Sequence, residues 1–179
     1  MAVQSGLAEY GKNNITYVSG MGSYLTYAAL STDIPCKKDN WRDIIISPMC
    51  KNCDICVKNC PTKAIKKDRF LIESRKCLSA INENTQDFPD WLPSSAHHTP
   101  FDCLKCQASC PMNKDKQEIT DVYFDEAETE RILEGAPYKD VSKELKKNIN
   151  LLGLDSWPSI PRNLRTLFDL MDKGHTPTL

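Results

Sequence analysis

The sequence predicts an α+β protein in three parts: a short β-containing N-terminal segment (1–35), a cysteine-rich domain (36–117) and a helical C-terminal tail (118–179). Three observations predict this division. Short runs of β-branched and aromatic residues flank a glycine turn near the N-terminus. All nine cysteines lie in the middle part, and apolar residues recur at helical spacing in the tail.

The N-terminal segment is expected to form a hairpin. Residues 15–18 and 24–30 are typical of short strands, because they combine β-branched, aromatic and other apolar side chains. Between them, Ser19-Gly20-Met21-Gly22-Ser23 is a turn signal. We therefore expect these two runs to pair with each other.

The tail is expected to be helical. Asp125-Glu126-Ala127-Glu128 places acids in a first helical turn, Gly135-Ala136-Pro137 ends that helix, and Pro161 and Gly174 bound a later one. Two apolar faces are expected, formed by Val141, Leu145, Ile149 and Leu152, and by Leu164, Leu167, Phe168 and Met171. These helices are expected to cover one side of the cysteine-rich domain, and the alternative is a face that docks a partner.

Composition narrows the class of protein. The net charge is −1, so there is no overall attraction to nucleic acid, and no run approaches the roughly 20 apolar residues that cross a bilayer. No charged-then-apolar leader follows Met1. The cysteine count is odd and the cysteines cluster closely, which favours metal binding over a disulfide framework. We expect a cytoplasmic protein in a reducing, anaerobic environment, without a membrane partner.

The first run of cysteines matches the bacterial ferredoxin motif. Residues 50–61 read C-x2-C-x2-C-x3-C-P without deviation. In this motif three thiolates bind one [4Fe–4S] cluster, and the fourth, before the proline, binds the other cluster. The middle of the chain is therefore expected to be a double [4Fe–4S] ferredoxin-like domain.

A second run supplies most of the second motif. Cys103, Cys106 and Cys110, followed by Pro111, fit its second, third and fourth positions, while the first position falls on Pro100, which has no ligand atom. Cys77 is the one cysteine in the intervening stretch and fills the vacancy. The first cluster is thus assigned Cys50, Cys53, Cys56 and Cys110, and the second is assigned Cys60, Cys77, Cys103 and Cys106. Cys36 is left over and is expected to be a buried or free thiol.

Alternatives remain at this point. Two Cys-x-x-Cys pairs also suit a four-cysteine zinc site, although that leaves four cysteines unexplained. The clusters could also be redox-inert and purely structural. The basic residues near the motifs would raise the cluster potential, contact nucleic acid phosphates or form a solvated face; they are Lys51, Lys58, Lys63, Lys66, Lys67, Arg69 and Lys105. Ile55, Val57, Ile65 and Leu104 are expected to be buried and to exclude water, and His97-His98 is expected to be a surface pair.

These motifs resemble epoxyqueuosine reductase and the related reductive dehalogenases. The likeness rests on residues 50–61, 75–79 and 102–114. Residues 5–13 are similar to the Gly-Leu-Gly-x-x-Gly-Lys-Asn segment of that family, with a departure at Ala8, and residues 32–35 (Thr-Asp-Ile-Pro) are similar to its Thr-Asp-Leu-Pro. The resemblance covers roughly residues 5 to 114.

The resemblance implies a cobalamin, held base-off beside the nearer cluster and reduced by single electrons. It also implies that Gly11, Lys12, Asn13 and Ser79 lie near this corrinoid, although Gly11–Asn13 equally suit a turn before a strand. In the family, the proton donor and most of the corrinoid domain precede the Gly-Lys-Asn segment. Since this chain starts almost there, we expect either part of a corrinoid enzyme or a separate electron-transfer protein, and no catalytic residue is assigned.

Three functions follow as hypotheses. The first is electron transfer through two [4Fe–4S] clusters to a corrinoid or a redox partner protein. The second is a cobalamin-dependent reductase acting on a modified tRNA base or an organohalide, with tRNA as a partner in the former case. The third is a structural or docking module with redox-inert clusters.

Overall fold

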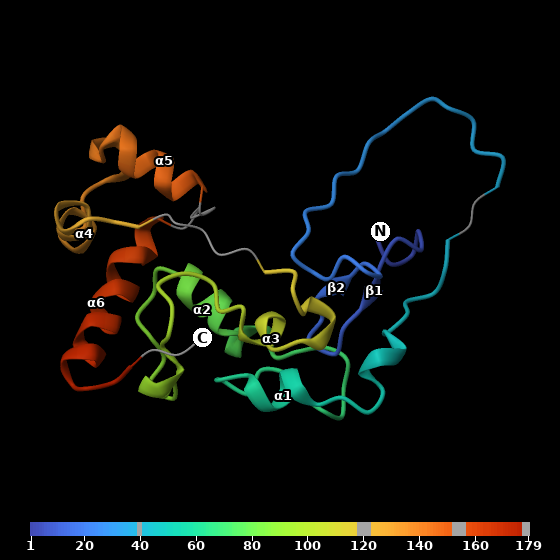
Figure 1. Ribbon diagram of the computed structural model, residues 1–179, viewed down its shortest axis with the longest axis horizontal. Coiled ribbons are helices and arrows are strands. Elements are labelled where there is room, and N and C mark those ends of the chain that lie inside the picture. Colours follow the sequence, from blue (N-terminus) through green and yellow to red (C-terminus); the bar gives the residue numbers. More distant parts are fainter. Residues whose placement is uncertain (39–40, 118–122, 152–156, 177–179) are drawn as a thin grey trace. The chain divides into compact units, whose positions relative to one another are not determined.

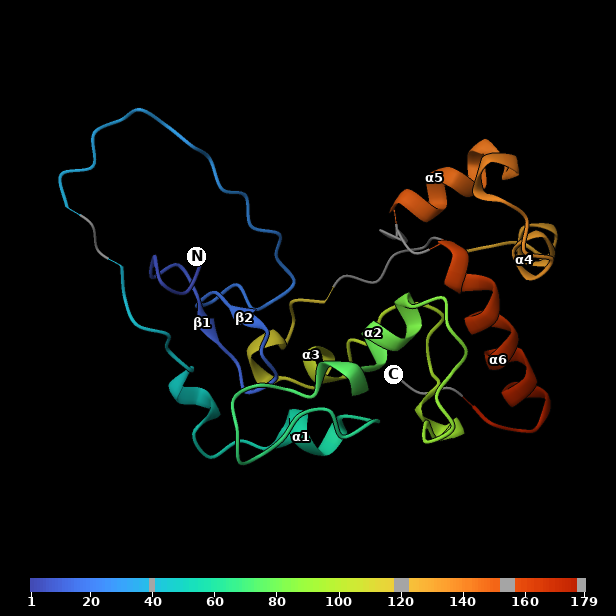
Figure 2. The same ribbon diagram turned by 180° about the vertical axis from the view of Figure 1, so that it is seen from behind.

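The computed structural model describes residues 1–38, 41–117, 123–151 and 157–176, and within them it is mostly helical with one small sheet (Figures 1 and 2). The chain divides into two compact units. The first unit is Met1–Glu73 with Lys105–Glu118, and the second unit is Ser74–Leu104 with Ile119–Leu179. The three-part division expected from the sequence stays a prediction.

The sheet of the first unit has two strands, β1 (Glu9–Tyr10) and β2 (Thr16–Tyr17), which pair antiparallel. The turn between them is closed by the Gly11 N–H, which donates to the Ile15 carbonyl at 2.7 Å. Asn14 in this turn has φ +62°, a left-handed conformation that asparagine tolerates better than most residues. The expected segment 15–18 is therefore extended in part, but its partner lies upstream.

The expected pairing with residues 24–30 is wrong, because those residues form no strand. The glycine turn does fold the chain back, with φ of +73° at Gly20 and +79° at Gly22, but it makes only one antiparallel bridge, between Val18 and Gly22. The next N–H, that of Ser23, donates to Asn113 Oδ1 at 2.8 Å, so the ladder stops there.

The remaining elements of the first unit are short. Helix α1 (Ile55–Asn59) and helix α3 (Lys105–Ala108) contact each other and lie side by side in both views (Figures 1 and 2). Two 3₁₀ turns, Pro48–Cys50 and Pro111–Asn113, each begin at a proline, which suits the first position of a helical turn because it lacks an N–H. Apart from Cys36, the cysteines of this unit lie within these turns and helices or directly beside them.

The second unit contains the longer helices α2 (Leu78–Glu83), α4 (Glu126–Leu133), α5 (Lys143–Leu151) and α6 (Ile160–Asp172). Its 3₁₀ turns are Ser74–Lys76, Ser94–Ala96, Tyr138–Asp140 and Trp157–Ser159. One apolar core joins α4, α5 and α6, and its buried members are Ile132, Val141, Leu145, Ile149, Trp157 and Ile160.

The expected start and end of α4 are confirmed. Asp125 and Glu128 form a capping box, in which each side chain accepts from the other's backbone N–H. Gly135, at φ +76°, follows the helix end in the left-handed conformation that terminates helices.

The expected apolar face of α6 is only partly buried. Leu167 is buried and Leu164 packs on the core, but Phe168 and Met171 are 40% and 52% exposed. The middle of the buried face is the polar Asn163, whose Nδ2 donates to the carbonyls of Asn82 and Pro100, both at 2.8 Å. For α5, the expected Val141, Leu145 and Ile149 are buried, and Leu152 lies outside the described residues.

No helix among the described residues is long and apolar enough to cross a bilayer.

Candidate iron–sulfur centre

One small cavity in the first unit gathers the four cysteines assigned to the first cluster. Cys50, Cys53, Cys56 and Cys110 all line it. The rest of its lining comes from the β1–β2 turn, from β2, from α1 and from the Cys-Pro turn, through Gly11, Lys12, Asn13, Tyr17, Ile55, Pro111 and Met112. Residues far apart in sequence therefore meet here, with thiols from two separate runs.

Short hydrogen-bonded turns set the spacing of the first three thiols. Cys50 ends a 3₁₀ turn, and the Cys53 N–H donates to its carbonyl at 3.3 Å. Cys56 lies in α1, whose last backbone bond runs from the Cys60 N–H to the Cys56 carbonyl at 3.1 Å. Cys50 and Cys56 are buried, which limits the access of water to these two thiols, and Cys60, assigned to the second cluster, is buried as well.

The donor chemistry of this cavity fits an iron–sulfur cluster. Burial, followed by the charges of four neighbouring cysteines led by Cys106, raises the pKa of the Cys56 thiol to about 11. Thiols packed this closely cannot all ionise unless a cation compensates them, and thiolates are the form that binds iron. Bound iron would supply that compensation.

A buried hydroxyl points to the same conclusion. The Tyr24 Oη is buried and has no hydrogen-bond partner among the residues that the structure describes. Burial raises the pKa of this phenol, with further contributions from the charges of Cys106 and Cys110. Since a buried donor without a partner is costly, cluster sulfur is a fitting acceptor for it. No sequence motif marks Tyr24.

Within the described residues, no three His, Cys, Asp or Glu side chains are arranged to hold a single metal ion. A cubane offers iron at four separate corners, so its ligands need not converge on one point.

The four cysteines assigned to the second cluster are divided between the units. Cys60 and Cys106 belong to the first unit, and Cys77 and Cys103 belong to the second. Cys60 Sγ accepts the Ala64 N–H at 3.2 Å, a backbone bond of the kind that stabilises thiolate ligands.

The loop around Cys103 in the second unit is strained and firmly held. Its neighbours Asp102 and Leu104 both have positive φ, +52° and +51°, which is uncommon for residues with a Cβ. Asn82 Nδ2 donates to the Asp102 carbonyl at 2.9 Å, and Ser79 Oγ donates to the Asp102 carboxylate at 3.2 Å. Ser79, which the family resemblance placed near a corrinoid, thus supports the loop of a cysteine.

The two histidines are buried, so the expectation of a surface pair is wrong. His97 and His98 are 6% and 8% exposed. The His98 ring nitrogens lie 2.8 Å from the Ala96 carbonyl oxygen and 2.9 Å from the Cys103 carbonyl oxygen, so an N–H on either nitrogen has a carbonyl acceptor. His97 packs edge-to-face on Phe88, with ring centroids 4.5 Å apart.

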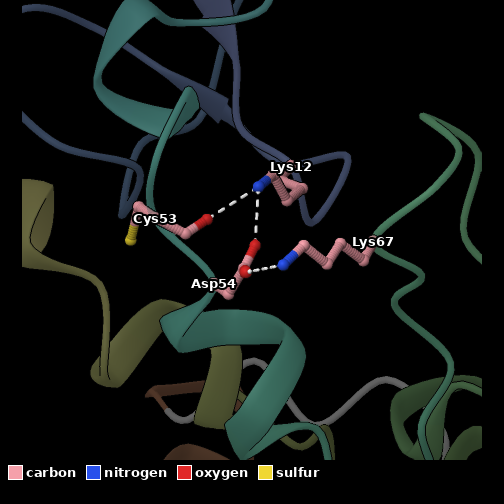
Figure 3. A network of polar contacts seen from close by, with 4 residues as sticks. All are labelled: Lys12, Cys53, Asp54 and Lys67. Carbon is pink, nitrogen blue, oxygen red and sulfur yellow. Dashed lines mark hydrogen bonds and ion pairs between the residues drawn. The ribbon is translucent and has the colours of Figure 1, made fainter.

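The other three residues from the resemblance form the β1–β2 turn beside the first cavity. Gly11 is buried, and a Cβ there would lie 2.5 Å from Asn13 Oδ1 and 2.6 Å from Tyr17 Cε2, so the position requires glycine. Lys12 Nζ donates to the Cys53 carbonyl at 2.7 Å and to Asp54 Oδ1 at 2.8 Å (Figure 3). The position of this turn is therefore compatible both with a structural role and with a role in lining the site.

The basic residues around the first run are partly neutralised. Lys67 pairs with Asp54 at 2.9 Å, while Lys66 and Arg69 pair with Glu73 at 3.4 and 3.2 Å. Hydrogen bonds from Lys12 and Lys67 lower the Asp54 pKa to about 2.

Other expected positions divide between buried and exposed. Ile65 is buried and Val57 half-buried, but Ile55 and Leu104 are 37% and 38% exposed. The expected burial of Ile55 and Leu104 is therefore wrong. Cys36 is an exposed free thiol.

Comparison with known proteins gives this arrangement a context. The family model described as "4Fe-4S double cluster binding domain" matches residues 49–113. The epoxyqueuosine reductase of Cyclobacterium marinum is 30% identical over 168 residues, which are 91% of this chain and 52% of that protein. The epoxyqueuosine reductase of Bacillus subtilis is 29% identical over 116 residues, 65% of this chain and 29% of that protein.

Two solved structures share the fold. A selenomethionine-labelled epoxyqueuosine reductase gives a TM-score of 0.67 at 22% identity, over 94% of this chain and 44% of that one. Epoxyqueuosine reductase from Streptococcus thermophilus gives 0.63 at 21% identity, over 98% of this chain and 50% of that one. The chain spans about half, or less, of the length of these relatives. The chain therefore resembles epoxyqueuosine reductases, matches the 4Fe–4S double cluster binding domain over residues 49–113, and covers only part of these homologues' length.

Proposed function

We propose that this chain passes single electrons through two [4Fe–4S] clusters to a corrinoid or to a redox partner protein. The observation that carries the proposal is the cavity lined by Cys50, Cys53, Cys56 and Cys110, with the Gly11–Asn13 turn in its wall. That turn matches the segment which, in the resembling family, lies near the corrinoid. A one-electron centre beside such a segment suits delivery of electrons to cobalt.

The residues of the chain act on the clusters in three ways. Cysteine thiolates bind iron, and bound clusters supply the one-electron chemistry. Burial of Cys50, Cys56 and Cys60 limits access of water, and the buried Tyr24 hydroxyl would donate to sulfur of a bound cluster and stabilise negative charge there. A corrinoid would carry out any reduction of substrate, while the protein supplies orientation and electrons.

A second candidate is a cobalamin-dependent reductase of the epoxyqueuosine reductase type. The observation in its favour is that the likeness to the Cyclobacterium marinum protein extends over 91% of this chain, well beyond residues 49–113. Under this candidate the substrate is the modified tRNA base, or an organohalide as in the related dehalogenases. Binding of tRNA that weakens steeply as salt rises would favour the tRNA version.

Electron paramagnetic resonance on the anaerobically reconstituted full chain tests the proposal. We expect about eight iron atoms per chain and, after a strong low-potential reductant, two interacting [4Fe–4S]⁺ signals. Adding cob(II)alamin should convert the cobalt spectrum to a base-off form if a corrinoid is the acceptor. An unchanged cobalt spectrum with two reducible clusters would leave a redox partner protein as the acceptor.

A matched pair of cysteine variants checks the ligand assignment. Cys36→Ser should keep all the iron, because Cys36 is exposed and lies outside both assigned sets. Cys53→Ser should lose iron from one cluster. Clusters that resist reduction in the unmodified chain would overturn the proposal and favour a structural or docking module.

A further inference from the structure

Lys12 is held against the Cys53–Asp54 loop beside the cysteine cavity. It lies in the β1–β2 turn, 41 positions before Cys53 in the sequence, and its Nζ donates to the Cys53 carbonyl at 2.7 Å (Figure 3). A second bond joins Nζ to Asp54 Oδ1 at 2.8 Å, so two of its three N–H donors are used within this loop. The Lys12 side chain is only 18% exposed.

The carboxylate of Asp54 serves two lysines that differ in their surroundings. Its Oδ1 accepts from Lys12, and its Oδ2 pairs with Lys67 Nζ at 2.9 Å (Figure 3). The Lys67 side chain is 76% exposed, so solvent screens its charge, whereas Lys12 lines the cavity itself. The three side chains carry a net charge of +1, and the less exposed of the two ammonium groups belongs to the residue that lines the cavity.

The charge of Lys12 interacts with thiols of the cavity and not only with Asp54. Its pKa is raised first by the hydrogen bond from its ammonium to Asp54, and further by the negative charges of Asp54, Cys50 and Cys56. The Lys12 ammonium is therefore close enough to Cys50 and Cys56 to stabilise negative charge on them. Any centre that gains negative charge in this cavity would be stabilised in the same way.

We propose that Lys12 is a positioning residue that holds the Cys53–Asp54 loop and raises the reduction potential of the cluster assigned to this cavity. The inference rests on the proposed function of electron transfer and deepens it. In the step concerned, one electron passes from a low-potential reductant to the cluster, the reductant is oxidised by one electron, and no bond is made or broken. The added negative charge is favoured by a nearby ammonium of low exposure. This role differs from the corrinoid contact that the family resemblance implied for Lys12.

The test compares Lys12→Met with Lys67→Met, since each removes one positive charge from the same carboxylate. Both full-length proteins are reconstituted anaerobically and titrated between defined potentials, with cluster reduction followed by electron paramagnetic resonance. At the unmodified cluster's midpoint, the ratio of reduced to oxidised cluster should fall about tenfold in Lys12→Met, equivalent to 59 mV for one electron. In Lys67→Met it should change less than about twofold, and the second cluster should not move in either variant.

Asp54→Asn supplies a shift of opposite sign. It removes the carboxylate but leaves Lys12 its bond to the Cys53 carbonyl, so the midpoint should rise. This variant also decides the question if Lys12→Met fails to hold iron. Lys12→Arg, which keeps the charge, should titrate close to the unmodified protein.

Hydrogen exchange of the iron-free chain gives a readout independent of the cluster. The peptide covering residues 50–58 should exchange faster in Lys12→Met than in Lys67→Met. Equal midpoints in the two methionine variants, or equal shifts of both clusters, would overturn the inference while leaving electron transfer intact. Irreducible clusters in the unmodified chain would instead overturn the proposed function, and this inference with it.

Discussion

Asn13 Nδ2 donates a hydrogen bond to the hydroxyl of Tyr17 at 2.9 Å, and both side chains are buried in the wall of the cysteine cavity. The same Asn13 accepts the Ile15 N–H through Oδ1 at 3.3 Å. The Asn13 amide thus holds both the turn after β1 and the side chain of Tyr17 in β2. Burial is the main cause that raises the Tyr17 pKa, so the phenol stays protonated as a donor.

Asn13→Ala should destabilise the first unit. The change leaves the buried Tyr17 hydroxyl without its donor and the Ile15 N–H without its acceptor, at a cost of about 1–3 kcal/mol in the free energy of unfolding. Anaerobic urea unfolding measures it. Asn59→Ala, on an exposed position of α1, is the control and should change stability by less than about 0.5 kcal/mol. Equal losses in both variants would contradict the structural role of Asn13.

Tyr24→Phe should have different effects on the iron-free chain and on the reconstituted chain. In the iron-free chain it removes a buried hydroxyl that has no partner, so stability should stay unchanged or rise. In the reconstituted chain it removes a donor to cluster sulfur, so a cluster midpoint should fall. Tyr27→Phe, at a residue 37% exposed, is the control. Midpoints that coincide in the two variants would show that the Tyr24 hydroxyl does not reach the cluster.

Stability of the second unit should fall in mild acid because of His97. Burial, followed by the charges of Arg162 and His98, lowers the His97 pKa below the usual value of 6.5. The unfolded chain then binds more protons than the folded chain once the pH drops below about 6.5, so the free energy of unfolding decreases there and stops decreasing below the folded-state pKa. Urea unfolding of the iron-free chain between pH 5 and 8 measures this slope. His97→Gln should flatten it, and an unaltered slope would contradict the prediction.

Leu145→Ala should destabilise the second unit strongly. Leu145 is 0% exposed in the core between α4, α5 and α6, and large-to-small changes at such positions cost about 2–5 kcal/mol. Met171→Ala, on the exposed end of the expected α6 face, should cost less than about 0.5 kcal/mol. Thermal unfolding followed by circular dichroism compares the two. A comparable loss in Met171→Ala would mean that this end of α6 is covered in solution.

Local signals in the sequence predicted the helical part of the fold well. Three signals lie within a few residues of the helix ends that they predict, and the structure confirms them: the acids of Asp125–Glu128 at the start of α4, Gly135 after its end, and Pro161 in the first turn of α6. The apolar repeat before and within α5 likewise predicted residues that are buried in the core. The four cysteines that the spacing assigned to the first cluster all line one cavity.

Contacts over long sequence distances limited the rest. The segment after Gly22 leaves the sheet because Asn113, 90 positions away, takes the Ser23 N–H. His98 is buried with its ring nitrogens beside the Ala96 and Cys103 carbonyl oxygens, and although these partners are near in the sequence, no pattern of neighbouring residue types reveals the contact. Tyr24 stands in no motif, so its orphaned hydroxyl was visible only in three dimensions.

The position of Cys110 in the cavity affects the stability of the protein after exposure to oxygen. A cluster ligated by both Cys56 and Cys110 would tie together two points about 54 positions apart, much as a covalent bridge does. By the loop-closure relation for such bridges, the tie would disfavour the unfolded chain by about 4 kcal/mol. Oxygen that dismantles the cluster would then release the constraint as well as the electron route. Oxidised molecules should become better substrates for proteases than intact ones, so loss of activity and clearance would be coupled.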